Sequence, residues 1–310
     1  MGNSNFRKKA TKKLQTYFGK LLNVKTCNLP NTVYHYTNAD ALNNIISKNA
    51  LWFSDIDYLN DESETRYIYE LVQSILDNKE IEINERFKNA ILSRCKYVKG
   101  NDYSQRKLGI SFNEKDFVLS FSKDSDNLIL WNNYTKNKDK LGYNIGFDRD
   151  KLLLSLKDKL SKKDNFIQGN VIYDIVKQKN LIKDLLKCFN NLLEEEDSQE
   201  SLIFQYVGIF LKVYALFYKK QCFENENEYR IVIGLIQDIH GKDCSCDFRN
   251  NNGLLIPYRE LNFDKNCITE VGISPTIKES LYNASIRRLL NRYDYDSKIK
   301  IFNSAIPLRY

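Results

Sequence analysis

The sequence VYHYTNADALNNIISKNALWFS, residues 33–54, decides the fold class of this chain. Residues 33–37 are rich in β-branched and aromatic side chains and predict a strand. Asn38 is a favoured helix-capping residue, and the apolar residues after it recur at helical spacing, which predicts a helix to about residue 49. Residues 51–54 then predict a short apolar strand. A strand, a helix and a strand in close succession indicate a domain that mixes both kinds of element.

Hydrophobic periodicity extends this pattern along the chain. We expect further helices at about 62–76, 84–97, 128–134 and 277–291, and strands at about 117–122, 143–147, 166–173, 229–233, 253–258 and 268–273. Residues 150–220 are mostly helical apart from one strand. We therefore predict a single α+β domain over residues 31–310, with a mixed or antiparallel sheet and a mostly helical insertion at about 150–220.

The net charge of +7 is concentrated at one end of the chain. Residues 1–26 contain seven basic residues and no acidic one. Apolar residues recur at helical spacing in the same segment, so residues 1–30 predict a basic amphipathic arm. Such an arm could contact a nucleic acid, a lipid surface or a partner protein such as an antitoxin, or dock on its own domain with its lysines in solvent. The balanced charge elsewhere argues against a uniform nucleic-acid-binding surface.

The cysteines and the apolar segments predict a cytoplasmic protein without a membrane span. The seven cysteines are scattered and odd in number, which favours reduced thiols. No apolar signal segment opens the sequence. Residues 202–218 are apolar but include Lys212, so they predict a buried core helix. Cys244 and Cys246 lack the spacing of a zinc site, and no metal is expected there.

Residues 223–233 combine charged and apolar side chains at the spacing of a strand. Glu226, Glu228 and Arg230 are each two residues apart, so they are expected on one face, with the apolar residues between them toward the core. Two carboxylates and a guanidinium on one face indicate either a binding site or an ion-pair patch that neutralises itself.

Histidine is rare in this chain, which contains only His35 and His240. His35 lies at the predicted junction of a strand and a helix, where a side chain is fixed yet open to a ligand, whereas His240 lies in a polar turn. The sequence contains no glycine-rich phosphate loop. Further candidates, each with a structural alternative such as helix capping or core packing, are Tyr36, Thr37, Asn60, Asp61, Glu64, Ser122, Trp131 and Tyr134.

Taken in order, these clusters resemble a large bacterial family catalogued as a domain of unknown function. The resemblance spans about residues 33–275, and it departs from the family pattern at Glu62, where proline is usual. The family pattern consists of Leu-Trp-Phe-Ser, Asn-Asp-x-x-Glu, Phe-Ser, Trp-x-x-Tyr, Gly-x-x-x-Gly-Phe-Asp and Phe-x-x-Glu-x-Glu-aromatic-Arg. The matching residues are 51–54, Asn60, Asp61, Glu64, Phe121, Ser122, Asn127, Trp131, Tyr134, Gly142, Gly146, Phe147, Asp148, Phe223, Glu226, Glu228, Tyr229 and Arg230.

The order of elements is also similar, more loosely, to that of ADP-ribosyltransferases, including DNA-modifying toxins. In those enzymes the first strand carries His or Arg and a late strand begins with the catalytic Glu. His35 and Glu228 occupy these places. The resemblance implies an ADP-ribosyltransferase-like sheet and NAD as the substrate. It further implies a toxin or phage-defence effector that acts on a protein or nucleic-acid acceptor.

The implied chemistry is cleavage of the nicotinamide–ribose bond of NAD through an oxocarbenium-like state. Glu228 would stabilise that cation, orient the ribose 2′-hydroxyl and accept the nucleophile's proton. His35 would hydrogen-bond a ribose hydroxyl. Cofactor binding by stacking, hydrogen bonding or charge is implied for Tyr36, Thr37, Ser122, Trp131, Tyr134 and Arg230.

Two other functions remain open from the sequence. In a metal-dependent, nuclease-like enzyme, Asp61, Glu64, Glu226 and Glu228 would gather Mg²⁺. That function requires these acids to converge and leaves His35 unexplained. The chain could instead be a non-catalytic module on the same fold that binds a partner through residues 1–26.

Overall fold

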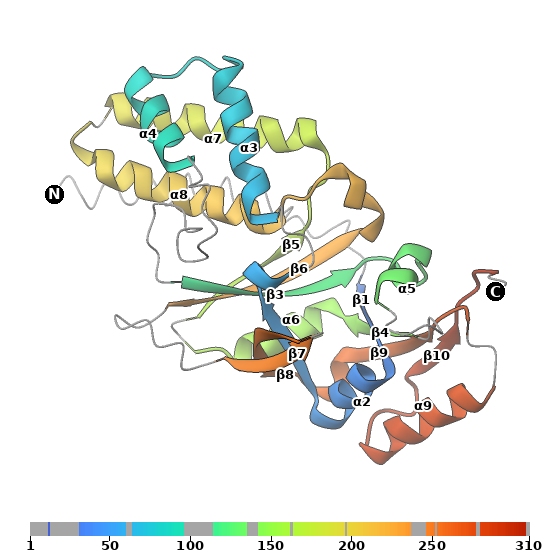
Figure 1. Cartoon of the computed structure of the whole chain (residues 1–310). Helices are drawn as coiled ribbons and strands as arrows, with labels where there is room; N and C mark the ends of the chain where they lie inside the picture. Colours follow the sequence, from blue (N-terminus) through green and yellow to red (C-terminus); the bar gives the residue numbers. More distant parts are fainter. Residues whose placement is uncertain are drawn as a thin grey trace. The chain divides into compact units, whose positions relative to one another are not determined.

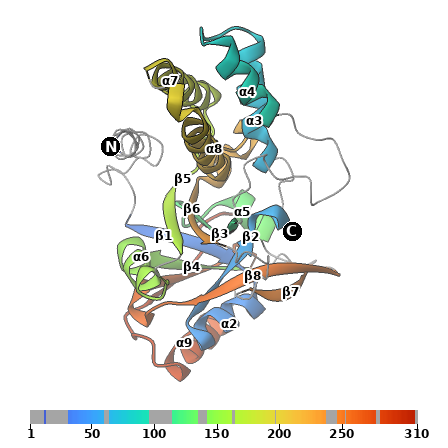
Figure 2. The same ribbon diagram turned by 90° about the vertical axis from the view of Figure 1, so that its left-hand side faces the viewer.

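The structure is a computed structural model, in which two compact units are distinguished. A sheet unit comprises residues 27–58, 114–168 and 224–310, and a helical unit comprises residues 1–26, 59–113 and 169–223. Helices α3, α4, α7 and α8 form one group, and the strands lie with α2, α5, α6 and α9 (Figures 1 and 2). The structure describes residues 12, 31–59, 64–95, 114–134, 142–161, 164–195, 197–236, 246–251, 253–276 and 280–307.

The helices and strands follow the predicted order closely. The strands are β1 (Thr32–Thr37), β2 (Ala50–Asp55), β3 (Glu114–Ser122), β4 (Tyr143–Asp148), β5 (Asn165–Asn170), β6 (Glu228–Ile236), β7 (Asp247–Asn251), β8 (Leu254–Asn262), β9 (Ile268–Ile273) and β10 (Lys300–Asn303). The helices are α2 (Ala39–Lys48), α3 (Glu64–Asp77), α4 (Glu85–Cys95), α5 (Leu128–Tyr134), α6 (Arg149–Asp158), α7 (Ile175–Glu195), α8 (Glu200–Phe217) and α9 (Ser280–Arg292). Asn38 caps α2 as predicted, because its Oδ1 accepts from the Ala41 N–H at 2.9 Å.

Strand β3 organises the sheet. β6 pairs antiparallel with the full length of β3 and so occupies one edge of β3. The other edge is shared, because β2 pairs near Val118 and β1 pairs at Ser122. One arm of the sheet continues as β1-β4-β9-β10, here called the β1 arm, and the other as β2-β8-β7, called the β2 arm. We call the point where the arms separate on β3 the fork.

The sheet is mixed and mostly antiparallel. Of the pairings whose register is described, only β9 with β10 is parallel. This confirms the predicted α+β class. β7 and β10 were not predicted, because β7 is polar and β10 is only four residues long.

One face of the sheet, the core face, buries the apolar side chains that alternate along its strands. Residues of α2, α6 and α9, such as Ile46, Leu156 and Leu290, pack against this face. Phe147 joins two edge-to-face contacts there, with Phe121 at 5.8 Å and Phe263 at 5.4 Å between ring centroids. Each large apolar side chain buried in this way contributes about 1.5–3 kcal/mol to stability. The side chains of the core face therefore stabilise the fold.

The helical unit has a core of its own. Phe87 of α4 stacks on Phe204 of α8 with centroids 5.6 Å apart, and Phe189 of α7 contacts Phe210 of α8 at 5.7 Å. Gln178 is fully buried, and its amide Nε2 donates to two backbone carbonyls. These contacts explain why this unit buries a polar residue without leaving it unpaired.

Helix α8 corresponds to the apolar segment predicted as a buried helix. Among the described residues it is the one helix long and apolar enough to cross a membrane by length and composition. Sixty-one per cent of it is buried. Burial of this extent is typical of a core helix in a folded domain.

The predicted helical insertion differs from the helical unit. Residues 150–168, which include most of α6 and most of β5, belong to the sheet unit, and residues 59–113 join 169–223 in the helical unit. The predicted insertion at about 150–220 therefore does not coincide with the helical unit, and the single α+β domain stays a prediction. Sequence periodicity identifies α3 and α4 as amphipathic helices, but not the partners that their apolar faces pack against.

Candidate active site on the polar face of the sheet

A buried ion pair lies at the start of β6. The Glu228 carboxylate accepts two hydrogen bonds from Arg230, from Nε to Oε1 at 2.7 Å and from Nη2 to Oε2 at 2.9 Å. The two residues are 5% and 1% exposed. Residues two apart on a strand share a face, so the sequence spacing itself brings the groups together. This bidentate geometry keeps both charges compensated in a site that excludes water.

The register of the sheet shows which side chains share a face with this pair. Glu228 is directly opposite Ser122 on β3, and Ser122 is opposite Tyr34 on β1. Arg230 is opposite Ser120. Directly opposed residues project to the same side of a sheet. These five side chains therefore lie on the face opposite the core, which we call the polar face.

Ser122 connects the end of β3 to the turn before β6. Its Oγ donates to the Glu226 carbonyl at 2.9 Å and accepts from the Asp124 N–H at 3.1 Å. The Lys123 N–H donates to the Asn227 carbonyl at 3.0 Å. Asn227 has a left-handed backbone, with φ 45°, a conformation that asparagine tolerates better than most residues. Ser122 therefore positions the backbone that presents Glu228.

Asp124 and Asn127 hold the loop between β3 and α5. The Asp124 carboxylate accepts from Asn227 Nδ2 at 2.9 Å and from Asn127 Nδ2 at 3.2 Å. Asn127 Nδ2 also donates to the Asn225 carbonyl at 2.7 Å, while its Oδ1 accepts from the Ile129 N–H at 3.0 Å. One side chain thus caps α5 and binds the turn that precedes β6.

Trp131 is part of the structure of this region. Its ring packs edge-on against Tyr36 with centroids 4.7 Å apart, and it is 2% exposed. Its Nε1 donates to Asp126 at 2.7 Å. The Asp126 carboxylate also accepts from Ser304 Oγ at 2.6 Å and from the Ala305 N–H at 2.8 Å. Trp131 therefore anchors α5, and the stacking role predicted for it finds no support in this packing.

Two tyrosines of β1 line the polar face. Tyr34 donates to Glu270 Oε1 at 2.5 Å. Tyr36 donates to the Asp124 carbonyl at 2.8 Å and accepts from the Asn127 N–H at 3.1 Å. Burial raises the pKa of both phenols far above the ordinary value, and Glu270 adds to the effect at Tyr34. Both side chains are thus neutral hydrogen-bonding groups at physiological pH.

Two residues of the Gly-x-x-x-Gly-Phe-Asp motif have structural roles. Gly146 lies opposite Tyr34, and a Cβ there would be 2.7 Å from Cγ of Glu270. Asp148 caps α6, because its Oδ1 accepts from the Lys151 N–H at 3.1 Å. These residues shape the β1 arm, and no chemistry needs to be assigned to them.

His35 lies on the core face, not with Glu228. The register places it on the side of Phe121, and the two rings meet edge-on at 5.8 Å. Its Nδ1 is 3.1 Å from the Ser120 carbonyl. Because a carbonyl only accepts, Nδ1 carries the proton in this contact. The predicted pairing of His35 with Glu228 in one site is therefore wrong.

The fork explains what His35 does instead. Ser120 lies midway between Val118, where β2 is paired, and Ser122, where β1 is paired. His35 supplies a donor to the carbonyl that the separating strands leave between them. Burial lowers the pKa of the His35 imidazole, and the charge of Arg249 acts in the same direction. A neutral imidazole thus closes a gap in the backbone pairing.

Other predicted site residues are dispersed. Glu226 ends a short 3-10 helix, Gln221–Glu226, so its predicted place on the strand face of Glu228 is wrong. The left-handed Asn227 interrupts the alternation between them. Thr37 is buried and shares the side of β1 that carries His35. Tyr134 ends α5 and is 36% exposed.

Several predictions fall on residues that the structure does not describe. Asn60, Asp61 and His240 lie outside the described residues, as does the basic arm apart from residue 12. Helix α3 begins at Glu64, whose side chain also lies outside them. Within the described part of the chain, no three His, Cys, Asp or Glu residues form a group that could hold a metal ion.

Asp126 and Asn144 also hold this region together, but they were not among the residues predicted from the sequence. Asn144 is fully buried, donates to the Ser125 carbonyl at 2.6 Å and accepts from the Gly272 N–H at 3.1 Å. The run of aspartates and asparagine at 123–127 between a strand and a helix was a usable signal for Asp126. Asn144 has no such signal, because it lies inside an apolar strand.

Comparisons with known proteins agree with part of the sequence analysis. No match was found among the curated proteins or among the solved structures. One family model, described as "Protein of unknown function (DUF2971)", matches residues 130–231. That segment runs from α5 into β6 and includes Trp131, Glu228 and Arg230. Over residues 130–231, the chain is similar to the DUF2971 family of proteins of unknown function.

Proposed function

We propose that this protein cleaves the nicotinamide–ribose bond of NAD and transfers ADP-ribose to a macromolecular acceptor. The observation that carries the proposal is the Glu228 carboxylate, buried at the start of a late strand and oriented by two hydrogen bonds from Arg230. The order of elements before it, with β1, α2 and β2 in succession, supports the resemblance to ADP-ribosyltransferases. The acceptor class stays a protein or a nucleic acid.

The chemistry assigned to Glu228 is electrostatic. The C1′–N bond breaks with its electron pair going to nicotinamide, and positive charge develops on the ribose. A fixed carboxylate in a water-excluding site stabilises such a charge without reorganisation. In the proposed step the same carboxylate also orients a ribose hydroxyl by accepting its hydrogen bond. An oxygen of the acceptor then forms the new bond to C1′ and passes its proton to the Glu228 carboxylate.

The supporting residues agree in part with those expected from the sequence, which include Ser122 and Tyr36 but not Tyr34. Ser122 and the neutral phenols of Tyr34 and Tyr36 share the polar face with Glu228 and supply hydrogen-bonding groups. Arg230 positions Glu228 and takes no separate part in cofactor binding. His35 acts through the fork and not on the substrate. The cysteine content favours a cytoplasmic setting for this activity, as expected for a toxin or phage-defence effector.

The test is release of nicotinamide from NAD by the full chain, with protein, RNA and DNA offered as acceptors. We expect Glu228→Gln to lower the release rate by about 100-fold or more, because it removes the charge that stabilises the transition state. Glu228→Asp keeps the charge but withdraws it by one methylene, and should lower the rate by about tenfold. Far-ultraviolet circular dichroism checks that both variants fold.

Glu260→Gln is the matched control, because Glu260 is a carboxylate of the β2 arm that already binds Trp52. Its release rate should equal that of the unmodified chain. Release that is unchanged in folded Glu228→Gln and Glu228→Asp would overturn the proposal. So would the absence of nicotinamide release with every acceptor offered.

A further inference from the structure

Arg249 is an incompletely paired cation on the β2 arm. It lies on β7, an edge strand, and its Nη2 donates to Ser54 Oγ at 2.8 Å. Its Nε is buried and has no hydrogen-bond partner. Among the described residues, no carboxylate forms an ion pair with this guanidinium. Burying a charge without a partner is costly, so an acceptor of opposite charge is expected there.

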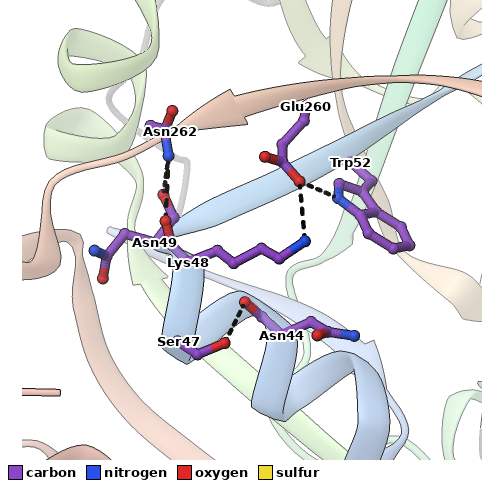
Figure 3. Close-up of polar contacts among 7 residues, drawn as sticks. All are labelled: Asn44, Ser47, Lys48, Asn49, Trp52, Glu260 and Asn262. Carbon is purple, nitrogen blue, oxygen red and sulfur yellow. Dashed lines mark hydrogen bonds and ion pairs between the residues drawn. The ribbon is translucent and has the colours of Figure 1, made fainter. Parts of the chain in front are cut away.

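One neighbouring acid of the β2 arm is already engaged. Glu260 of β8 accepts from Trp52 Nε1 at 2.7 Å, and Lys48 Nζ lies 3.9 Å from the same oxygen. Figure 3 shows this carboxylate between Trp52 and Lys48, at the end of α2 where Asn262 binds the Lys48 and Asn49 carbonyls. Glu260 thus has its own cation and does not neutralise Arg249.

The other acids near Ser54 and Arg249 in sequence are no better placed. Asp55 is paired with Lys115 at 3.0 Å, and it follows Ser54 on the strand, so it projects from the opposite face. Asp247 shares a face with Arg249 but is exposed and makes no ion pair with it. The positive charge of Arg249 is therefore left uncompensated by the described part of the chain.

Ser54 provides a second donor beside the guanidinium. It is buried, and its oxygen accepts the bond from Arg249, so its own proton points elsewhere. No other described residue receives that proton in a hydrogen bond. Tyr258 lies directly opposite Ser54, and its ring rests on Trp52 with centroids 4.4 Å apart. The aromatic pair borders the donors on one side with an apolar surface.

We propose that Arg249 and Ser54 form a binding site for the oxyanion of a phosphoryl group. A phosphoryl group has enough terminal oxygens to accept from the guanidinium and the serine hydroxyl together, and it supplies the missing negative charge. The site does not depend on NAD cleavage, since its occupation is measured by binding.

Isothermal titration calorimetry of the full chain with inorganic pyrophosphate tests the site. We expect binding that weakens by about tenfold or more in Arg249→Gln, which removes the charge and the Nε donor. Ser54→Ala should weaken it several-fold. Arg249→Lys keeps the charge but lacks the planar guanidinium, so its affinity should fall between those of Arg249→Gln and Ser54→Ala. Lys48→Gln is the matched control, a cation of the same region already paired with Glu260, and should bind as the unmodified chain does.

Two further titrations identify the source of the phosphoryl group. ADP represents a free nucleotide, and a short single-stranded oligonucleotide represents a nucleic-acid backbone. Tighter binding of either one, lost in Arg249→Gln, supports the site and names its source. No binding of pyrophosphate at millimolar concentration would overturn it. Equal binding by folded Arg249→Gln, or binding of succinate as tight as that of pyrophosphate, would also overturn it.

Discussion

Two strands of this protein carry an acid and an arginine two residues apart, with opposite results. On β6, Glu228 and Arg230 form a bidentate ion pair that is almost completely buried. On β7, Asp247 is exposed and Arg249 reaches Ser54 instead. β6 is paired on both sides, by β3 and β5, whereas β7 is an edge strand. The same spacing thus yields an ion pair inside the sheet and, within the described part of the chain, a cation without a counter-charge at its edge.

The comparison separates two kinds of evidence for a site. A compensated pair is compatible with catalysis but also with structure alone, since buried pairs are common without a function. An uncompensated donor set is less easily explained by structure, because it costs stability unless something binds. The role proposed for Glu228 therefore depends on its position in the fold. The role proposed for Arg249 depends on the hydrogen bonds that its guanidinium does not make among the described residues.

Breaking the β6 pair should have the largest effect on stability. Arg230→Gln leaves Glu228 buried without its cation, so we expect the free energy of unfolding to fall by about 3–5 kcal/mol. Both tryptophans, Trp52 and Trp131, lie in the sheet unit, so urea unfolding followed by tryptophan fluorescence reports on this unit. The double variant with Glu228→Leu and Arg230→Met should recover most of the loss. A loss below about 1 kcal/mol would mean that the pair is not buried as described.

Acidification should act through His35, which lies at the fork between the two arms. Burial lowers its folded-state pKa, so below about pH 6.5 the unfolded state binds the proton and the folded state resists it. The contribution of His35 to the free energy of unfolding is therefore fully present above that pH. It is lost progressively as the pH decreases toward the folded-state pKa. We expect a loss of about 1 kcal/mol between pH 7.5 and 5.5.

His35→Gln should remove that pH dependence, as measured by urea unfolding at the two pH values. His240→Gln is the natural control, because His240 is the only other histidine, and this variant should keep the dependence. The same loss in His35→Gln as in the unmodified chain would contradict the role of a neutral imidazole at the fork.

Removing the edge cation should have the smallest effect. Without ligand, Arg249→Gln should leave the free energy of unfolding unchanged or raise it by up to about 1 kcal/mol, because an uncompensated charge is lost. Arg259 offers the contrast, since it binds the Asp164 carboxylate with both terminal nitrogens, at 3.0 and 2.9 Å. Arg259→Gln should cost about 1.5–3 kcal/mol in the same measurement. A similar cost for Arg249→Gln would show that Arg249 has a structural partner.

Most helices and strands of the sheet unit could be predicted from the sequence, because their signals come from residues that are close together in the chain. The strand-helix-strand signal of residues 33–54, the Asn38 cap and the alternation of Glu228 to Ile233 depend on neighbours in the chain. The family match over residues 130–231 likewise rests on the order of side chains. Glu228 and Arg230 were placed on one face because strand period alone requires it.

Which residues make up the two sites could not be predicted from the sequence. Which face of β1 meets Glu228 depends on the register between β1, β3 and β6, and a shift of one residue would exchange His35 with Tyr34 or Tyr36. The left-handed Asn227 removes Glu226 from the strand, and no periodicity reveals it.

The sequence by itself therefore determined the α+β class, most helix and strand positions and the shared strand face of Glu228 and Arg230, because these follow from spacing along one chain segment. Only the tertiary structure decided that His35 closes the fork, that residues 59–113 join residues 169–223 in the helical unit, and that Arg249 has no counter-charge among the described residues. Those facts depend on which distant strands meet and which groups their meeting buries. Burial and register are properties of the assembled sheet, and no single segment encodes them.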